Sequence, residues 1–172
     1  RLQAFGVTEP DSGTDTTRIT TTAVRDGDHY VVNGQKIWTS RVGHSDLMVL
    51  LARTASRDTM PKPTQGLSVF MVDLRDEIDH SITITPIETM INHSTNSVFF
   101  DDLKVPAENL IGNENEGFRY ILDGMNAERI LIGAECIGDA RFLVQRAAAY
   151  ASEREVFGRP IGQNQGIQFP LV

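Results

Sequence analysis

The sequence predicts an α+β protein, in which an antiparallel β-sandwich or barrel is followed by the first helices of a truncated helical bundle. Two differences in composition along the chain indicate this division. Residues 3 to about 110 are rich in Val, Ile, Thr and Phe, whereas residues from about 115 onward are rich in Ala, Glu, Arg and Leu. The length of 172 residues, 40% of them hydrophobic, is enough for a sizeable core. We therefore expect a β-domain over residues 1–112 and the start of a helical domain over residues 113–172.

Short segments rich in β-branched and aromatic residues, separated by turn signals, predict seven or so strands in the first part. These segments are 3–8, 18–25, 30–32, 35–40, 46–54, 66–74, 82–85 and 97–100. Asp26-Gly27-Asp28 predicts a turn, Asn33-Gly34 is the strongest hairpin signal, and Asp101-Asp102 predicts a turn after the last strand. Residues 55–65, with two Pro and several polar residues, predict an exposed loop.

The second part contains one long helical pattern, predicted from about residue 116 to about residue 153. The polar and acidic stretch 113–117 favours a helix start, and Gly158-Arg159-Pro160 interrupts the pattern. A second helix is expected near Gln163. One helix and part of a second cannot bury their own apolar faces, so we expect partner helices from polypeptide outside this chain.

Composition excludes several classes of function. The net charge of -7 disfavours a non-specific nucleic-acid binder. The single cysteine, Cys136, cannot form an internal disulfide, and no apolar run approaches the roughly 18 residues that span a bilayer. The histidines are scattered without metal-ligand spacing, so no metal site is expected. The expected location is the cytoplasm or the mitochondrial matrix; a start at Arg1 rather than Met leaves these two open.

The loop from Thr8 to Asp15 is the first segment with chemistry of its own. It follows a predicted strand and offers hydroxyls, carboxylates and, near Gly13, accessible backbone N–H groups. Such a loop suits an anion or a planar heterocycle with alternating donors and acceptors, although the same composition also makes an ordinary turn.

Several motifs in series resemble the acyl-CoA dehydrogenase family. The resemblance covers essentially all of the chain, in order and at the family's spacing, and corresponds to the middle β-domain and the opening of the C-terminal helical domain. The N-terminal helical domain and most of the C-terminal one have no counterpart here. The motifs are Val7-Thr8-Glu9-Pro10-x-Ser12-Gly13-Thr14-Asp15, Gly34-Gln35-Lys36-x-Trp38-x-Ser40, Phe99-Phe100-Asp101-Asp102-x-x-Val105-Pro106, Glu116-Gly117-Phe118, Glu128-Arg129, and Arg154-x-x-Phe157-Gly158-Arg159-Pro160-Ile161 with Gln165.

The resemblance implies FAD as cofactor, because matching positions in relatives contact it. Those along the flavin are Phe5, Val7, Thr8, Gly13 and Thr14, while Trp38 packs on the ring and the Ser40 hydroxyl reaches N5. The positions matching Arg154, Phe157 and Gln165 approach the diphosphate and adenine of a neighbouring subunit's FAD. A site shared in this way implies a homo-oligomer, either a dimer or a tetramer.

The implied reaction is the α,β-dehydrogenation of an acyl-CoA thioester, with the electrons passed to an electron-accepting flavoprotein. A Glu takes the α-proton and flavin N5 takes the β-hydride. In one branch of the family this base matches Glu128, whereas in much of the family it lies at a position beyond Val172. Glu128 is therefore a candidate base, with a solvated helical Glu as the alternative. The resemblance also places Thr14, Asn126 and Arg129 against the substrate.

Two other classes of function remain open from the sequence. Acyl-CoA oxidases, flavin monooxygenases and nitroalkane oxidases share this scaffold, and their reactivity with oxygen cannot be read from these residues. A non-catalytic β-sandwich binding module would also fit the acidic charge and the many short strands.

Overall fold

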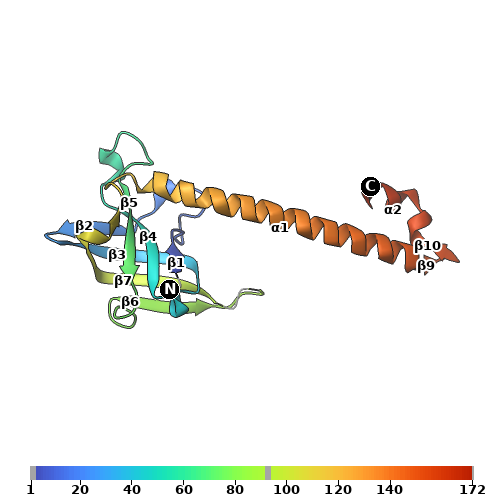
Figure 1. Ribbon diagram of the computed structural model, residues 1–172, viewed down its shortest axis with the longest axis horizontal. Coiled ribbons are helices and arrows are strands. Elements are labelled where there is room, and N and C mark those ends of the chain that lie inside the picture. Colours follow the sequence, from blue (N-terminus) through green and yellow to red (C-terminus); the bar gives the residue numbers. More distant parts are fainter. Residues whose placement is uncertain (1–2, 92–93, 172) are drawn as a thin grey trace. The chain divides into compact units, whose positions relative to one another are not determined.

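The computed structural model describes residues 3–91 and 94–171, and the chain divides into two compact units (Figure 1). The first unit extends to Asp123 and contains the sheet, and the second runs from Gly124 to the C-terminal end. The predicted α+β class is confirmed, since one mixed eight-stranded sheet precedes the helices.

The sheet has the strand order β6-β7-β3-β2-β4-β5-β8, with β1 paired to β4 off this path. Most neighbours are antiparallel, as predicted, but β1 pairs with β4 in parallel, and β2 meets β4 in parallel at Thr22 and Arg53. The sheet is therefore mixed, because β1 and β2 approach β4 from crossovers rather than from hairpins. The strands are β1 Gln3–Gly6, β2 Thr22–Asp26, β3 His29–Ser40, β4 Leu47–Arg53, β5 Leu67–Asp73, β6 Ile82–Ile87, β7 Thr95–Pro106 and β8 Leu110–Ile111.

Short 3₁₀ segments connect several strands of the first unit. They are η1 Thr16–Arg18, η2 Val42–His44, η3 Arg57–Thr59 and η4 Ala107–Asn109. The predicted loop 55–65 contains η3 and no strand.

One hydrophobic core lies beneath the sheet. β4 and β5 supply its centre, since their apolar runs are buried on both faces, and the Tyr30 and Phe70 rings meet edge-on with centroids 4.8 Å apart. Burying each large apolar side chain stabilises the fold by about 1.5–3 kcal/mol. The largest fully buried apolar side chains are Tyr30, Phe70, Phe100, Ile19, Met48, Leu50, Leu51, Leu67, Leu74, Ile82 and Leu103.

The hairpin predicted at Asn33-Gly34 is wrong, because both residues lie inside the continuous strand β3. β3 advances two residues from Val32 to Gly34 while β7 advances three from Phe100 to Leu103, so the irregularity is a bulge. The Asn33 amide donates to Asp102 Oδ1 at 2.9 Å and accepts from the Asp102 backbone N–H at 2.8 Å.

The turn predicted at Asp101-Asp102 is wrong for the same reason, since both residues lie within β7. The hairpin that does form joins β2 to β3, where Asp26 pairs with His29 and Gly27 takes a φ of 62°. Asn-Gly and Asp-Asp pairs tolerate positive φ in bulges as well as in turns, so local composition did not separate the two structures.

The helix α1 spans Gly117–Glu153, which confirms the predicted long helix. Its first turn lies against the sheet: a Cβ on Gly117 would sit 2.6 Å from Ser68 Cα, so only glycine fits there. The Ser68 hydroxyl accepts from the Asn115 backbone N–H at 2.8 Å and bonds to the Thr54 hydroxyl at 2.6 Å. These contacts define where the helix begins.

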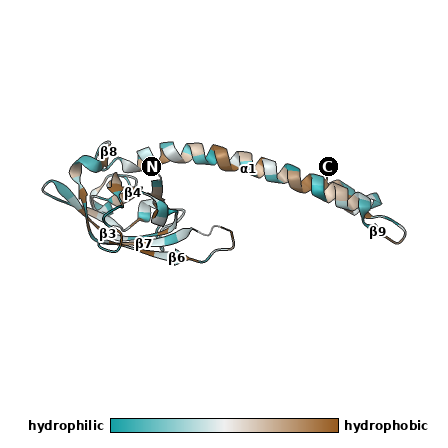
Figure 2. Ribbon diagram, turned by 60° about the horizontal axis from the view of Figure 1, so that its bottom comes forward, coloured by the Kyte–Doolittle hydropathy of each residue, from teal (hydrophilic) through white to brown (hydrophobic). Residues whose placement is uncertain are grey.

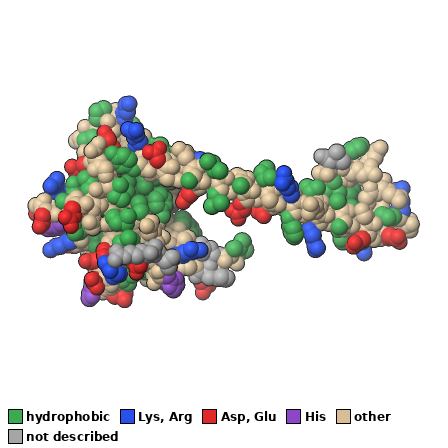
Figure 3. Space-filling model, viewed as in Figure 1, with side chains coloured by type: hydrophobic (Ala, Val, Ile, Leu, Met, Phe, Trp, Pro, Cys, Tyr) green, Lys and Arg blue, Asp and Glu red, His purple; other side chains and the backbone are tan. Residues whose placement is uncertain are grey.

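Within the second unit, hydrophobic and hydrophilic positions are interspersed along α1 (Figure 2), and the face seen in Figure 3 exposes several hydrophobic side chains. Ile130, Leu131 and Ile132 are consecutive, and each is more than half exposed; so are Phe142 and Leu143. Large apolar side chains at consecutive helix positions are normally covered by other helices, which agrees with the expectation of partner helices.

After α1 the chain forms a small hairpin of β9 Glu155–Val156 and β10 Arg159–Pro160, then η5 Ile161–Gln163 and α2 Gln165–Leu171. The predicted second helix is thus present and begins close to Gln163. None of the helices in the described part of the chain is long and apolar enough to cross a membrane.

Candidate functional site

The first group of predicted site residues begins on β1. Phe5 faces outward with 39% of its surface exposed, whereas Val7 is buried. Only the main chain of Val7 is therefore available to a cofactor. The Thr8 carbonyl accepts a hydrogen bond from the Ile37 backbone N–H at 2.9 Å, which ties the start of the loop to β3.

The loop that follows is internally hydrogen-bonded. Glu9 and Ser12 exchange two backbone hydrogen bonds of 3.1 Å, and the Ser12 hydroxyl donates to the Asp15 carbonyl at 2.8 Å. Asp15 then caps η1 by accepting from the Thr17 backbone N–H at 3.2 Å and from its hydroxyl at 2.6 Å. These bonds leave Gly13 and Thr14 exposed at the outer bend of an ordered loop.

A β-bulge in β3 places Trp38 and Ser40 on the outside of the sheet. β3 advances three residues from Lys36 to Thr39 while β7 advances two, from Val98 to Asn96. In a regular strand Lys36, Trp38 and Ser40 would share one face, since side chains alternate. The extra residue changes this: Lys36 and Thr39 are buried, and Trp38 and Ser40 are exposed.

Trp38 itself takes the left-handed conformation at the bulge, with a φ of 61°. Such a φ is costly for a bulky residue and is concentrated at functional sites. Its side chain is 57% exposed, so Trp38 is not part of the hydrophobic core. The exposed indole, the hydroxyls of Thr14 and Ser40, and the loop backbone near Gly13 together suit a planar heterocycle.

Behind the exposed groups lies a buried ion pair that the sequence analysis did not single out. Lys36 is fully buried and Glu9 is 4% exposed, and Lys36 Nζ donates to Glu9 Oε1 at 2.8 Å. Burial alone would raise the pKa of the Glu9 carboxyl, but the charge of Lys36 and the hydrogen bonds from Lys36, Thr21 and Thr20 lower it to about 2. Burial lowers the pKa of the Lys36 ammonium to about 8, against the opposing effect of Glu9. Both residues stand in the quoted motifs, and a lysine within a predicted strand was the one sign of a buried charge.

The second group of predicted residues lies on α1. Asn126, Glu128 and Arg129 are all exposed, and Arg129 Nη1 donates to Asn126 Oδ1 at 2.8 Å. Glu128 lines a depression of about 490 Å³ together with Met125, Arg129, Ile132 and Gly133. A carboxylate beside apolar side chains is the arrangement from which a base acts once the surroundings close over it.

The third group lies in the hairpin and helix after α1. Phe157 is fully exposed at the hairpin tip, where Phe157 and Gly158 take φ values of 55° and 75°. Arg154 holds the base of the hairpin, since its N–H donates to the Tyr150 carbonyl and its carbonyl accepts from Ile161. Arg154 and Gln165, the first residue of α2, both have exposed side chains.

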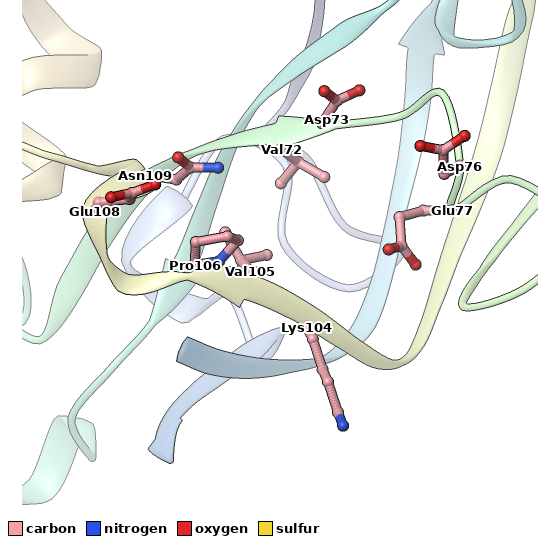
Figure 4. Close-up of a pocket in the computed structure, with 9 residues that line it drawn as sticks. All are labelled: Val72, Asp73, Asp76, Glu77, Lys104, Val105, Pro106, Glu108 and Asn109. Atoms are coloured by element: carbon pink, nitrogen blue, oxygen red, sulfur yellow. The ribbon is translucent and has the colours of Figure 1, made fainter. Parts of the chain in front are cut away.

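A separate hollow of about 350 Å³ lies on the first unit (Figure 4) and contains none of the predicted site residues. Asp73, Asp76, Glu77 and Glu108 give it an acidic lining, and Figure 4 shows the Lys104 side chain directed away from them. Asp73 forms an ion pair with Arg75, and no group of residues within 3–91 and 94–171 has the make-up of a metal site.

Comparison with known proteins identifies what these features belong to. Residues 4–103 match the family model described as acyl-CoA dehydrogenase, middle domain, and residues 115–172 match that of the acyl-CoA dehydrogenase C-terminal domain. A short-chain-specific acyl-CoA dehydrogenase of Clostridium acetobutylicum is 36% identical over 174 residues, which cover 99% of this chain and 44% of that protein.

Solved structures agree in fold. An acyl-CoA dehydrogenase from Geobacillus kaustophilus matches with a TM-score of 0.85 and 35% identity, over 98% of this chain and 44% of the other. A solved structure described as the electron transferring flavoprotein of Acidaminococcus fermentans contains a chain that matches with a TM-score of 0.81 and 34% identity. The match covers 99% of this chain and 44% of the other. The prolyl acyl carrier protein oxidase AnaB matches with a TM-score of 0.83 and 27% identity, over 99% of this chain and 44% of the other.

The chain spans less than half the length of the relatives that it matches. Within that span, the middle-domain model covers the sheet up to residue 103 in β7, and the C-terminal model covers all of α1 and everything after it. The chain belongs to the acyl-CoA dehydrogenase family.

Proposed function

We propose that this chain is part of a longer FAD-dependent acyl-CoA dehydrogenase that introduces a double bond between Cα and Cβ of an acyl-CoA thioester. The observation that carries the proposal is the bulge at Trp38, which turns an indole and the Ser40 hydroxyl outward at a backbone cost. Family membership supports the reaction class. We also propose that the β-domain ends at residue 112 and that the helical domain begins at residue 113.

In this proposal, the first unit holds the isoalloxazine ring. Trp38 and Phe5 supply exposed aromatic surface, and Ser40 and Thr14 supply hydroxyl donors. Thr8, Gly13 and Val7 contribute through the ordered loop, Val7 by its main chain alone. Bound FAD would supply the acceptor for the β-hydride.

The second unit contributes the proton chemistry. Glu128 takes the α-proton from the substrate, while Arg129 and Asn126 hold the thioester end from the same helix, already joined by their 2.8 Å hydrogen bond. The apolar neighbours Met125 and Ile132 line the same depression as the Glu128 carboxylate, where bound substrate would exclude water from the base.

Arg154, Phe157 and Gln165 are proposed to bind the diphosphate and adenine of FAD held by a neighbouring subunit. An exposed guanidinium can contact a diphosphate through two parallel hydrogen bonds, and an exposed aromatic ring can stack on adenine. This requires a homo-oligomer. The proposed electron acceptor is an electron-transferring flavoprotein, and the bacterial origin of the relatives named above favours the cytoplasm of the two locations considered.

The test uses the full-length protein. We expect it to purify with a bound yellow flavin that is bleached under anaerobic conditions by a saturated acyl-CoA of a suitable chain length. A full-length protein that takes up no flavin would refute the proposal and leave a non-catalytic binding module as the better reading.

An oxidase is the second candidate, favoured by the structural match to the prolyl acyl carrier protein oxidase. The two functions differ in how the reduced flavin meets oxygen. Stopped-flow mixing of the substrate-reduced enzyme with air separates them: slow reoxidation supports the dehydrogenase, and reoxidation as fast as turnover supports the oxidase.

A further inference from the structure

We propose that Lys36 and Glu9 act together as a positioning pair that holds the two flavin-facing segments, the Thr8–Thr14 loop and the Trp38–Ser40 bulge, in one fixed arrangement. The inference rests on the proposed flavin binding. It assigns a function to two charged residues that are both buried.

Lys36 connects the two segments directly. It lies two residues before Trp38, and its ammonium donates both to the Val7 carbonyl at 3.0 Å and to Glu9 Oε1 at 2.8 Å. Its aliphatic stem runs beside Gly6, where an added Cβ would sit 3.5 Å from Lys36 Cγ. One side chain of β3 therefore holds the end of β1 and the beginning of the loop.

Glu9 extends this connection to the rest of the loop. Its carboxylate accepts from the Thr20 N–H at 2.6 Å, the Thr20 hydroxyl at 2.9 Å and the Thr21 N–H at 3.0 Å. Its backbone is bonded to Ser12, which immediately precedes Gly13. The carboxylate thus closes the loop across eleven to twelve residues of chain.

The bulge separates the direction of Trp38 from that of Lys36. Without the extra residue in β3, Trp38 would share the buried face of Lys36. Lys36 continues the inward alternation of Tyr30 and Val32, and the bulge directly after it turns Trp38 outward. The buried pair and the exposed indole are therefore only two residues apart on one strand.

A role in stability alone is the competing explanation. Buried ion pairs add little or nothing over well-packed apolar residues, because the cost of removing two charges from water offsets their attraction. Their geometry is nonetheless demanding, since each lone pair and proton needs a partner. The hydrogen bonds of the pair reach Val7, directly after β1, and Thr20 and Thr21, directly before β2. The pair therefore constrains the segment between these strands more than it stabilises the core.

The experiment measures FAD binding by the reconstituted full-length protein and the visible spectrum of the flavin at saturation. Lys36→Met removes the charge and keeps the stem, and Glu9→Gln removes the opposite charge in an isosteric side chain. Arg53→Met is the matched control: Arg53 holds the chain after that loop by donating to the Thr17 carbonyl at 2.8 Å and the Ile19 carbonyl at 3.1 Å. These hydrogen bonds fall outside both flavin-facing segments.

We expect Lys36→Met and Glu9→Gln to raise the FAD dissociation constant about tenfold or more beyond Arg53→Met, and to alter the spectrum of the flavin even at saturation. A dissociation constant within about threefold of that of Arg53→Met, with an unchanged spectrum, would overturn the inference. If Lys36→Met does not fold, Glu9→Gln decides alone. A wild-type protein without flavin would instead overturn the proposed function, before any variant is compared.

Discussion

Lys36 and Trp38 lie two positions apart on β3 and yet face opposite sides of the sheet. Lys36 is completely buried, whereas Trp38 is 57% exposed. The cause is the bulge between Lys36 and Thr39, at which Trp38 takes a φ of 61°. This relationship links the hydrogen bonds beneath the loop to the aromatic surface above it.

Replacing Trp38 by glycine should separate stability from flavin binding. Glycine takes positive φ at no steric cost, so Trp38→Gly is expected to leave the fold as stable as before, or to stabilise it by up to about 1 kcal/mol. The flavin would lose its aromatic contact, and FAD affinity should fall about tenfold or more. Thermal unfolding of the apoprotein and FAD titration measure the two effects.

Val24→Gly is the control for this variant. Val24 is also exposed, at 62%, and lies in a strand without a positive φ, so the substitution should cost about 0.5–1 kcal/mol and leave FAD affinity unchanged. Equal destabilisation by both glycines would mean that the left-handed conformation of Trp38 carries no strain.

Much of the fold could be predicted because the pattern was unambiguous. The run Leu47-Met48-Val49-Leu50-Leu51-Ala52 is typical of a buried strand, and it forms most of β4. The ends of α1 were predicted from the polar stretch before Gly117 and from Gly158 and Pro160, which follow the helix.

The two bulges could not be predicted, since each depends on a partner strand far away in the sequence. The first bulge includes the hydrogen bonds between Asn33 and Asp102, which are 69 residues apart in the sequence. The bulge at Trp38 is defined only by the pairing of β3 with β7. Motif resemblance predicted the site residues, and their role stays a prediction. The partner of Lys36, 27 residues away, became visible only when the loop was folded.

The close packing at Gly34, beside the first bulge, predicts how the protein's stability responds to an added side chain. Gly34 has a φ of 147°, and a Cβ there would lie 2.6 Å from Thr21 Cα, which is backbone and cannot move aside cheaply. Gly34→Ala should therefore destabilise the protein by about 3 kcal/mol. Gly27 has a φ of 62°, but no atom lies within 4 Å of where its Cβ would be. Gly27→Ala should therefore destabilise the protein by only about 1 kcal/mol. Comparable losses in urea unfolding would contradict the close approach.

Acid should weaken the fold through Glu9. The pKa of its carboxyl is lowered in the folded protein to about 2 from an ordinary value of 4.5, so the folded state binds the proton less tightly than the unfolded state. The associated stabilisation, of about 3 kcal/mol, is complete above pH 4.5 and is lost as the pH falls toward 2.

Unfolding midpoints measured across this range for wild type and Glu9→Gln test that effect. The variant lacks the titrating group, so the stability difference between the two proteins should shrink steadily below pH 4.5. A difference that stays constant with pH would place the acid sensitivity in other carboxylates.

Glu128→Gln tests the proposed base. The amide keeps the shape of the side chain but cannot accept the α-proton, so kcat should fall by about a thousandfold while FAD stays bound, because Glu128 is not among the flavin-facing residues. Glu135→Gln, an exposed carboxylate on the same helix, should change kcat by less than about twofold. Anaerobic flavin reduction by acyl-CoA measures the chemical step directly. Reduction by Glu128→Gln at nearly the wild-type rate would move the base to a position beyond Val172.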